Sequence, residues 1–404
     1  MGGMEAITGG VTAARGFRAS GVAAGIKYAE RKDFALLVSD LPAQAAAMFT
    51  TNAVAAAPVL LGRERIGAGR IRAVAINSGC ANACTGARGL EDAREMSRAV
   101  SEALALPDAQ VLVCSTGVIG VNLPMARIVA GAAKAAAALT ATGGEDAAQA
   151  IMTTDTVDKQ AAVKLMVDGI AVTIGGMCKG AGMIEPYMAT MLAFMTTDAA
   201  VSAADLDAAL RQAVEVSFNR VVIDGDRSTN DTVVLLANGA SGAAPLSPAH
   251  PAWNEFAAAL THVCTSLAHQ MVMDGEGATK FVTVHVRGAR SDADAQKAAR
   301  AIAKSALVKT SWFGNDPNWG RVIAAAGYSG AVVDDQLARI HYGAACAYDR
   351  GVVADEPALR ALQAVMRQRA FEVTVDLGLG SGSDTIFTCD LSIDYVKINA
   401  EYTT

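Results

Sequence analysis

The chain has few aromatic and few charged residues for its length. Phe, Trp and Tyr account for 5% of its 404 residues and charged residues for 18%, whereas hydrophobic residues account for 52%. The net charge is −6, and no run of Lys and Arg provides the clustered cations that contact nucleic-acid phosphates. We therefore expect a well-packed globular protein with no nucleic-acid partner, organised as one large or two medium domains.

A long apolar segment is also missing. The first eight residues, Met1 to Thr8, contain no apolar core of a signal peptide. The alanine-rich stretch 128–139 is short and carries Lys134, which predicts a helix of the globular fold and not a membrane span. We expect a cytoplasmic protein without a membrane partner.

The cysteines and histidines do not form a recognisable site. The seven cysteines are odd in number and scattered, which fits a reducing cytoplasm, and Cys80 and Cys84 are too isolated to indicate zinc. No G-x-S-x-G elbow occurs, and none of the five histidines lies near a plausible nucleophile in sequence, which argues against a Ser-His-Asp hydrolase. The acidic loop 224–231 lacks the closing glutamate of a calcium loop. We predict a tight turn in a polar network there, and no metal site.

Apolar runs alternate with helical patterns along the whole chain, which predicts an α/β or α+β fold. A helix over 90–106 is expected to stop before Pro107, and Ser202 begins another with a capping-box pattern. The segment 378–384 is predicted to be a turn between strands. Further expected elements are a helix through 256–267 and strands at 111–114, 282–286 and 391–395.

Hydroxyl groups follow the predicted strand that ends at Cys114. The hydroxyl of Thr116 and the unhindered N–H of Gly117 are suited to an oxyanion hole, although a plain strand-to-helix turn has the same pattern. A second polar run, 151–158, offers hydroxyls for a substrate carboxylate or amide, or simply caps a helix end. Glu276 stands between two glycines, which let a carboxylate approach an amine-bearing ligand closely; a solvated hairpin tip is the alternative.

The segment 179–198 contains the most specific signal. Lys179 lies in a glycine-rich turn that leads to Met188, Ala189 and Thr190, followed by an apolar run. A threonine hydroxyl is a weak nucleophile unless a base activates it, and the α-amine of an N-terminal threonine is one such base. That chemistry requires a cut between Ala189 and Thr190. An ordinary core strand over 188–194 is the alternative.

This segment resembles the self-cleaving site of the ornithine acetyltransferase (glutamate N-acetyltransferase) family, whose members have an N-terminal threonine nucleophile. The similarity extends from one end of the chain to the other. It is carried by the segments 10–18, 49–52, 76–79, 217–220, 316–321 and 398–404.

The resemblance implies a layered helix–sheet–sheet–helix fold, cut into an α chain (1–189) and a β chain (190–404) that assemble as a heterotetramer of two α and two β chains. It assigns Thr190 as the nucleophile, and Thr116 with Gly117 as the oxyanion hole. No cofactor is implied, although acetyl-CoA is a possible co-substrate. The matching substrate-binding positions are Thr153, Lys179, Thr190, Glu276, Asn399 and Thr404.

The implied reaction is ping-pong transfer of an acetyl group from N-acetylornithine to glutamate in arginine biosynthesis. An N-terminal-nucleophile amidase or aminopeptidase, a related acetyltransferase of an antibiotic pathway, and an uncleaved binding protein are the alternatives. Cys80 and Tyr187 stand where the family has an asparagine and a smaller polar residue, which bears on acceptor preference. We expect the strand at 391–395 to carry Asn399 and Thr404 to the Thr190 pocket.

Overall fold

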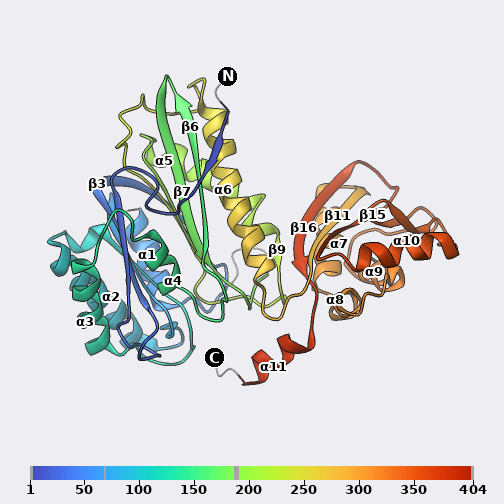
Figure 1. The fold of residues 1–404 in the computed structure, drawn as a ribbon, viewed down its shortest axis with the longest axis horizontal. Coiled ribbons are helices and arrows are strands. Elements are labelled where there is room, and N and C mark those ends of the chain that lie inside the picture. Colours follow the sequence, from blue (N-terminus) through green and yellow to red (C-terminus); the bar gives the residue numbers. More distant parts are fainter. Residues whose placement is uncertain (1–2, 68–69, 186–190, 402–404) are drawn as a thin grey trace.

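The computed structural model describes residues 3–67, 70–185 and 191–401. Tyr187, Ala189, Thr190 and Thr404 lie outside these residues. The described chain forms two mixed β-sheets with helices packed on them, and Figure 1 shows the sheets in two lobes. The α/β fold class is therefore confirmed.

The first lobe contains a nine-stranded sheet in the order β1-β6-β7-β8-β10-β3-β4-β5, with β2 added beside β3. Strand β3 pairs with β2 and β4 through its first half and with β10 through its second half. Its pairing register with β4 shifts between Val38 and Ala43. The strands are β1 (Glu5–Ile7), β2 (Phe17–Val22), β3 (Phe34–Phe49), β4 (Ile71–Asn77), β5 (Val111–Ser115), β6 (Lys159–Val167), β7 (Ile170–Lys179), β8 (Leu192–Thr197) and β10 (Thr232–Ala237).

The two halves of this sheet pack face to face. Ala35 and Leu37 from one half of β3 share a buried cluster with Ala45 and Ala47 from the other half. Their neighbours in the first half, Phe34, Leu36 and Val38, belong to a different cluster that includes residues of the helices α1, α2 and α3. This alternation follows from the two-residue period of a strand.

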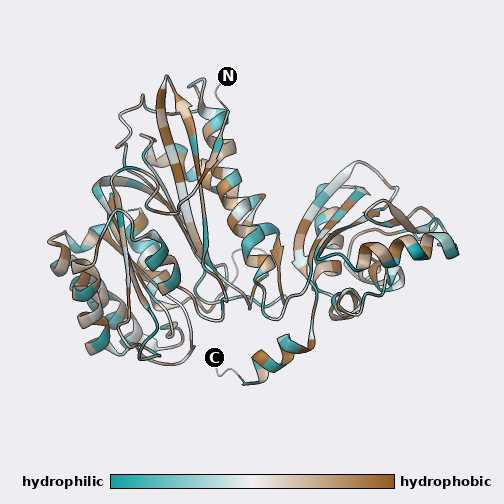
Figure 2. Cartoon of the chain, in the orientation of Figure 1, coloured by the Kyte–Doolittle hydropathy of each residue, from teal (hydrophilic) through white to brown (hydrophobic). Residues whose placement is uncertain are grey.

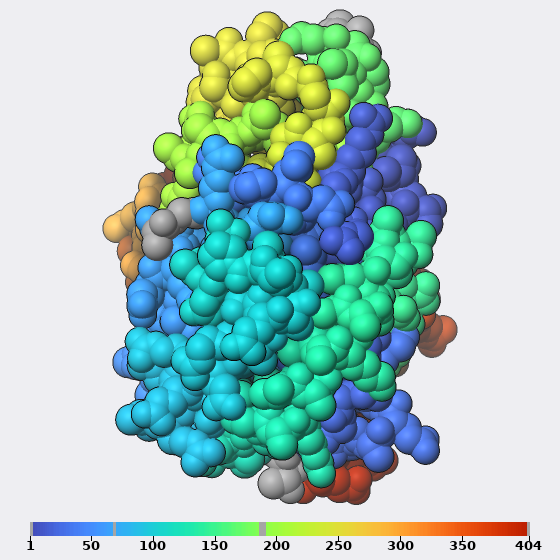
Figure 3. Space-filling model, turned by 90° about the vertical axis from the view of Figure 1, so that its left-hand side faces the viewer, coloured from blue at the N-terminus to red at the C-terminus, as the bar shows by residue number. Residues whose placement is uncertain are grey.

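Helices cover both outer faces of these two layers. Helices α1 (Ala57–Ile66), α2 (Gly86–Leu104) and α3 (Met125–Ala137) pack outside the β2–β5 half, and Figure 3 shows α2 and α3 covering much of one face of the molecule. Helices α5 (Ala203–Glu215) and α6 (Trp253–Met273) pack outside the half that contains β6–β8 and β10. The predicted helix–sheet–sheet–helix layering is thus present in this lobe. The short helix α4 (Gly144–Ala150) packs against β2 and β3.

The second lobe is an additional α/β layer pair that the sequence patterns did not distinguish. Its seven-stranded sheet has the order β14-β13-β12-β15-β11-β16-β9 and shares one buried cluster with its helices. Figure 2 shows hydrophobic residues concentrated on the strands of both lobes. The elements are β9 (Val221–Val222), β11 (Phe281–Ala289), β12 (Arg339–Tyr342), β13 (Ala345–Asp349), β14 (Val352–Val353), β15 (Ala370–Asp376), β16 (Gly382–Cys389), α7 (Asp292–Lys304), α8 (Ala306–Phe313), α9 (Trp319–Gly327) and α10 (Glu356–Met366).

Most of the predicted elements are present. The helix expected over 90–106 is α2, which ends at Ala105 in a left-handed conformation (φ 52°). The strands expected at 111–114 and 282–286 lie within β5 and β11, and 378–381 forms the turn between β15 and β16. Ser202 caps α5 by accepting a hydrogen bond from the Asp205 N–H, as its pattern predicted.

The strand predicted at 391–395 is wrong, because the chain enters the helix α11 (Ile393–Glu401) there. The Ser392 hydroxyl accepts a hydrogen bond from the Tyr395 N–H at 3.3 Å and donates one to the Gly277 carbonyl at 2.6 Å. This hydroxyl therefore occupies the N-cap position of the helix. The alternating apolar residues do not face a core, since Ile393 is 63% exposed. Figure 1 shows α11 extending below the two lobes.

Across the described residues, the helices are too short or too polar to span a membrane.

His269 on α6 packs against two strands of the second lobe. Its ring lies against Phe281 and Phe387, with centroids 5.2 and 4.4 Å away, and its Nε2 has no hydrogen-bond partner among the described residues. Burial lowers the pKa of His269. The unfolded chain therefore binds the proton more readily, and stability is lost as the pH falls below the unfolded pKa of about 6.5.

We predict that His269→Phe makes the protein less sensitive to acid. The difference between the melting temperatures at pH 7 and pH 5 should be smaller in this variant than in the wild type. His262→Gln, at an exposed position of the same helix, is the control and should leave that difference unchanged. Equal differences in the wild type and His269→Phe would contradict the prediction.

Candidate active site

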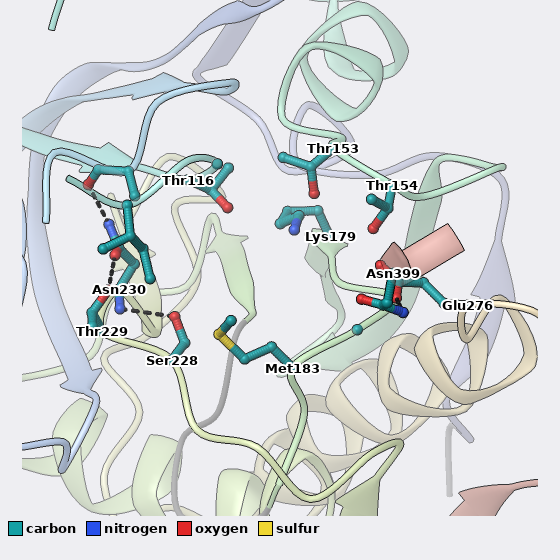
Figure 4. A pocket seen from close by; sticks show the side chains of 14 residues that line it. Thr116, Thr153, Thr154, Lys179, Met183, Ser228, Thr229, Asn230, Glu276 and Asn399 are labelled. Atoms are coloured by element: carbon teal, nitrogen blue, oxygen red, sulfur yellow. Dashed lines mark hydrogen bonds between the residues drawn. The ribbon is translucent and has the colours of Figure 1, made fainter. Parts of the chain in front are cut away.

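A pocket forms where the carboxyl ends of β5 and β7 meet the loop before β10, the end of α6 and the helix α11 (Figure 4). It brings together six of the residues predicted from the sequence. Thr190 and Thr404 lie outside the described residues. The residues that line the pocket are Ala81, Thr116, Gly117, Ile119, Thr153, Thr154, Lys179, Gly182, Met183, Ser228, Thr229, Asn230, Glu276 and Asn399.

The backbone around Thr116 and Gly117 is held against the loop that follows β4. The Thr116 N–H donates to the Asn77 carbonyl at 3.0 Å, and the Ala81 N–H donates to the Val118 carbonyl at 2.9 Å. Gly117 has φ 128°, and a Cβ atom there would lie 2.3 Å from the backbone carbon of Gly79. Only glycine fits this position, so the backbone next to the Thr116 hydroxyl is fixed in place.

Cys80 lies behind this loop and does not line the pocket. Its thiol donates to the Val121 carbonyl at 3.1 Å, and burial raises its pKa. Asn77 supports the same loop, because its Nδ2 donates to the Cys80 carbonyl at 2.8 Å and its Oδ1 accepts from the Ser115 hydroxyl at 2.6 Å. Cys80 therefore supports the loop and is not part of the pocket wall.

Lys179, at the end of β7, is the cation of the pocket and is almost completely buried. Its Nζ lies 3.8 Å from Asp155 Oδ2, which is an ion pair without a hydrogen bond. Burial lowers the pKa of Lys179, and the negative charge of Asp155 opposes this effect. Figure 4 shows the Lys179 side chain beside Thr153 in the pocket.

Glu276 and Asn399 form the polar end of the pocket near Lys179. The Asn399 Nδ2 donates to Glu276 Oε2 at 2.7 Å, so α11 brings Asn399 to the site as a helix and not as the predicted strand. A Cβ atom on Gly182 would lie 2.6 Å from the Glu276 carboxylate, which shows how closely the backbone approaches it. The hairpin alternative for Glu276 is wrong, because this segment connects α6 to β11.

The sequence patterns missed Ser228, Thr229 and Asn230 as pocket residues. Asn230 Nδ2 donates to the carbonyl groups of Ala81 and Ser115, at 2.7 and 2.8 Å, and its Oδ1 accepts from the Thr229 hydroxyl at 2.6 Å. The polar network predicted for 224–231 is thus present and lies at the pocket. The available signal was a run of four polar residues directly before the buried strand β10.

This loop also holds both described flanks of the predicted cleavage site. Asp224 accepts hydrogen bonds from the N–H groups of Met183 and Ile184, at 2.5 and 2.8 Å. Asp231 Oδ1 accepts from the N–H of Met191, the residue after Thr190, at 2.9 Å. Burial raises the pKa of Asp231 well above its usual range. The N–H of Met191 is therefore held by a buried carboxyl group.

The arrangement has a clear division of chemistry. Thr116 lies on one side of the pocket, and Lys179, Glu276 and Asn399 lie on the other, as Figure 4 shows. A hydroxyl and a glycine N–H are suited to a developing oxyanion, whereas a cation and a carboxylate suit the two charges of an amino acid. Within the described ranges no group of three or more His, Cys, Asp or Glu side chains is arranged to hold a metal ion.

Known proteins are similar to this chain over nearly its whole length. Residues 18–404 match the model of the ArgJ family. The "Arginine biosynthesis bifunctional protein ArgJ" of Geobacter sulfurreducens is 53% identical over 390 residues, covering 96% of this chain and 99% of that protein. The protein of the same name from Symbiobacterium thermophilum is 51% identical over 411 residues, covering 99% and 100%.

Among solved structures, "Ornithine Acetyltransferase complexed with Ornithine" from Mycobacterium tuberculosis is 45% identical. The match covers 45% of this chain and 98% of that chain, with a TM-score of 0.43.

We predict that Asn230→Ala destabilises the protein. The two carbonyl groups that its amide serves would be left buried without a partner, at a cost of about 1–3 kcal/mol for each. Urea unfolding should show this loss in the free energy of unfolding. Asn52→Ala, which removes two solvent-exposed bonds, one to the Arg227 carbonyl and one from the Val54 N–H, is the matched control and should change the free energy of unfolding by less than about 0.5 kcal/mol. Equal effects in the two variants would contradict the prediction.

Proposed function

The chain belongs to the ArgJ family, and on that premise we propose that it transfers an acetyl group from N-acetylornithine to glutamate. It is an acyltransferase of arginine biosynthesis. The observation that carries the proposal is the convergence of Thr116 and Gly117 with Lys179, Glu276 and Asn399 in one pocket. Met191 is held beside this pocket by Asp231, within one residue of the proposed nucleophile.

In the proposed mechanism, the Thr190 hydroxyl attacks the acetyl carbonyl of N-acetylornithine, and the Thr190 α-amine accepts the hydroxyl proton. The Thr116 hydroxyl and the Gly117 N–H stabilise the oxyanion. The amide C–N bond then breaks, the departing nitrogen takes the proton, and ornithine leaves an acetyl ester on Thr190. The glutamate amine attacks this ester, the C–O bond breaks, and the Thr190 hydroxyl is restored with N-acetylglutamate as product.

The charged side of the pocket selects an amino acid. The Lys179 ammonium binds the substrate carboxylate, and the Glu276 carboxylate binds an ammonium group, with Asn399 as donor and acceptor between them. Thr153 adds a hydroxyl beside Lys179. Thr404 lies outside the described residues and is assigned to the substrate site by the motif match alone. These assignments rest on the positions of the described residues and on the motif match.

The proposal includes the assembly and the environment. Self-cleavage gives an α chain of residues 1–189 and a β chain of residues 190–404, which assemble as a heterotetramer in the cytoplasm. The reaction needs no cofactor. The relatives are called bifunctional, and we propose acetyl-CoA as a second acetyl donor, whose thioester is attacked by Thr190 in the same way with CoA as the leaving group.

Acetyl exchange tests the proposed reaction. Purified enzyme with N-acetylornithine should release ornithine rapidly only when glutamate is present, and N-acetylglutamate should form in equal amount. Rapid release of acetate in the absence of glutamate would instead identify an amidase, with water as the acceptor.

We predict that the purified protein consists of two chains cut between Ala189 and Thr190, and that Thr190→Ala leaves one uncut chain without exchange activity. Removing the hydroxyl removes the nucleophile for both reactions. Intact-mass analysis measures the cut, and cleavage of the Thr190→Ala variant at the same bond would overturn the assignment of Thr190.

For the oxyanion hole we predict that Thr116→Ala lowers kcat by about 10²–10³-fold, the usual loss for one oxyanion donor. Thr116→Ser retains the hydroxyl group and is the matched control, with kcat within about fivefold of the wild type. Steady-state kinetics on cleaved, folded protein measures both values. A loss below about threefold in Thr116→Ala would place the oxyanion hole elsewhere.

A further inference from the structure

A buried cluster of charges lies directly behind the substrate side of the pocket. It contains Asp155, Lys159 and Asp274, whose side chains are 0%, 0% and 5% exposed. Lys159 Nζ donates to Asp155 Oδ1 at 2.8 Å, to Asp274 Oδ2 at 2.5 Å and to the Val157 carbonyl at 3.2 Å. All three protons of this ammonium are therefore used within the cluster.

Asp155 connects the cluster to two segments that line the pocket. Its Oδ2 accepts from the N–H of Thr153 at 3.0 Å, and its Oδ1 accepts from the N–H of Gly180, the residue after Lys179, at 2.7 Å. One carboxylate thus fixes the backbone at Thr153 and next to Lys179. Burial of such a group is costly unless its oxygens are paired, and here each oxygen has partners.

Asp274 connects the cluster to the third segment of the substrate side. It lies at the end of α6, two residues before Glu276, and accepts from the N–H and the hydroxyl of Thr156. Through Asp155 and Asp274, the ammonium of Lys159 therefore joins the loop 151–158, the end of β7 and the turn that carries Glu276. These are the segments that carry Thr153, Lys179 and Glu276.

Lys179 itself is left without a hydrogen bond to any described residue. Its Nζ stands 3.8 Å from Asp155 Oδ2, beyond hydrogen-bonding distance, whereas Lys159 and the two backbone N–H groups donate to the Asp155 carboxylate. The Lys179 ammonium is consequently near a negative charge but free to donate to a ligand in the pocket.

We propose that the Asp155–Lys159–Asp274 cluster positions Lys179 for substrate: it holds the segments around Lys179 so that the Lys179 ammonium stays beyond hydrogen-bonding distance of Asp155 and available to the substrate carboxylate. This inference rests on the proposed function, in which Lys179 binds that carboxylate. Asp155 and Lys159 are positioning residues, since they act on substrate through Lys179 and Thr153.

The charges around Lys179 predict in which direction its pKa changes when one of them is removed. Burial lowers the pKa of Lys179, Asp155 raises it, Lys159 lowers it, and Glu276 and Asp231 raise it. Loss of the Asp155 charge should therefore lower this pKa further, and loss of the Lys159 charge should raise it. Because substrate binding needs the ammonium form, kcat/KM falls as the pH rises through the pKa of Lys179.

The test compares Asp155→Asn with Asp274→Asn as a matched control. Each variant removes one carboxylate from the same Lys159 ammonium, but Asp155 also forms the ion pair with Lys179. For Asp155→Asn we expect the KM for N-acetylornithine to rise at least about tenfold, with kcat changed less than about threefold. The alkaline limb of kcat/KM should move down by about one pH unit. Asp274→Asn also disturbs the turn that carries Glu276, so its KM should rise as well, but its alkaline limb should move less than that of Asp155→Asn, because the ion pair of Lys179 is with Asp155.

Lys159→Met tests the direction of the pKa shift of Lys179. Removing the Lys159 charge should raise that pKa, so the alkaline limb of kcat/KM should move to higher pH. If Lys159→Met does not fold, the comparison of Asp155→Asn with Asp274→Asn still tests the inference. An equal shift of the alkaline limb in Asp155→Asn and Asp274→Asn, or an unmoved limb in Asp155→Asn, would overturn the inference. Lys179→Met separates this result from the proposed function: if it keeps the wild-type KM and limb, the role of Lys179 in the proposed function is wrong.

Discussion

The site depends on the bend of strand β3. Between Val38 and Ala43 the pairing register shifts, and the two halves of the strand then pair with different partners. Both halves contribute side chains to the same buried cluster, so the strand lies on both sides of one interface. This bend stacks the β2–β5 layer on the layer of β6, β7, β8 and β10. As a result, the end of β5 and the start of β10 meet, and Asn230 bridges to the Ser115 carbonyl.

The composition of the chain suits this stacking. Alanine at positions 35, 43, 45 and 47 fills the interface between the layers with small side chains. Because the two layers pack closely, the loops at the edge where they meet are partly buried. Their buried polar groups therefore need specific hydrogen-bond partners. Asn230, Asp231 and Asp224 supply them to three neighbouring segments. The loop 224–231 is therefore a structural connection and part of the pocket at once.

The charged side of the pocket has a different basis. A lysine as buried as Lys179 is disfavoured in its charged form, and its closest carboxylate is already engaged by Lys159. Burial of the Asp155–Lys159–Asp274 cluster beside Lys179 contributes little to stability by itself, because desolvation offsets the attraction between the charges. Its consequence is geometric, since three segments distant in sequence are fixed relative to one another. A preorganised site of this kind loses little freedom when substrate binds.

Local patterns in the sequence determined the helices α2, α5 and α6, the strands β5 and β11, and the candidates Thr116, Gly117, Lys179 and Glu276. Helical spacing, caps and strand ends are properties of neighbouring residues, so they can be predicted from the sequence. The motif match added the layered fold, Thr153, Asn399 and the assignments of Thr190 and Thr404. Only the tertiary structure decided that Asn399 arrives on a helix, because Ser392 meets the Gly277 carbonyl 115 residues away. It also decided that Asn230 and Asp155 belong to the site. Asn230 meets the carbonyl groups of Ala81 and Ser115, and Asp155 meets the N–H of Gly180, and no local period encodes contacts between residues so far apart in sequence.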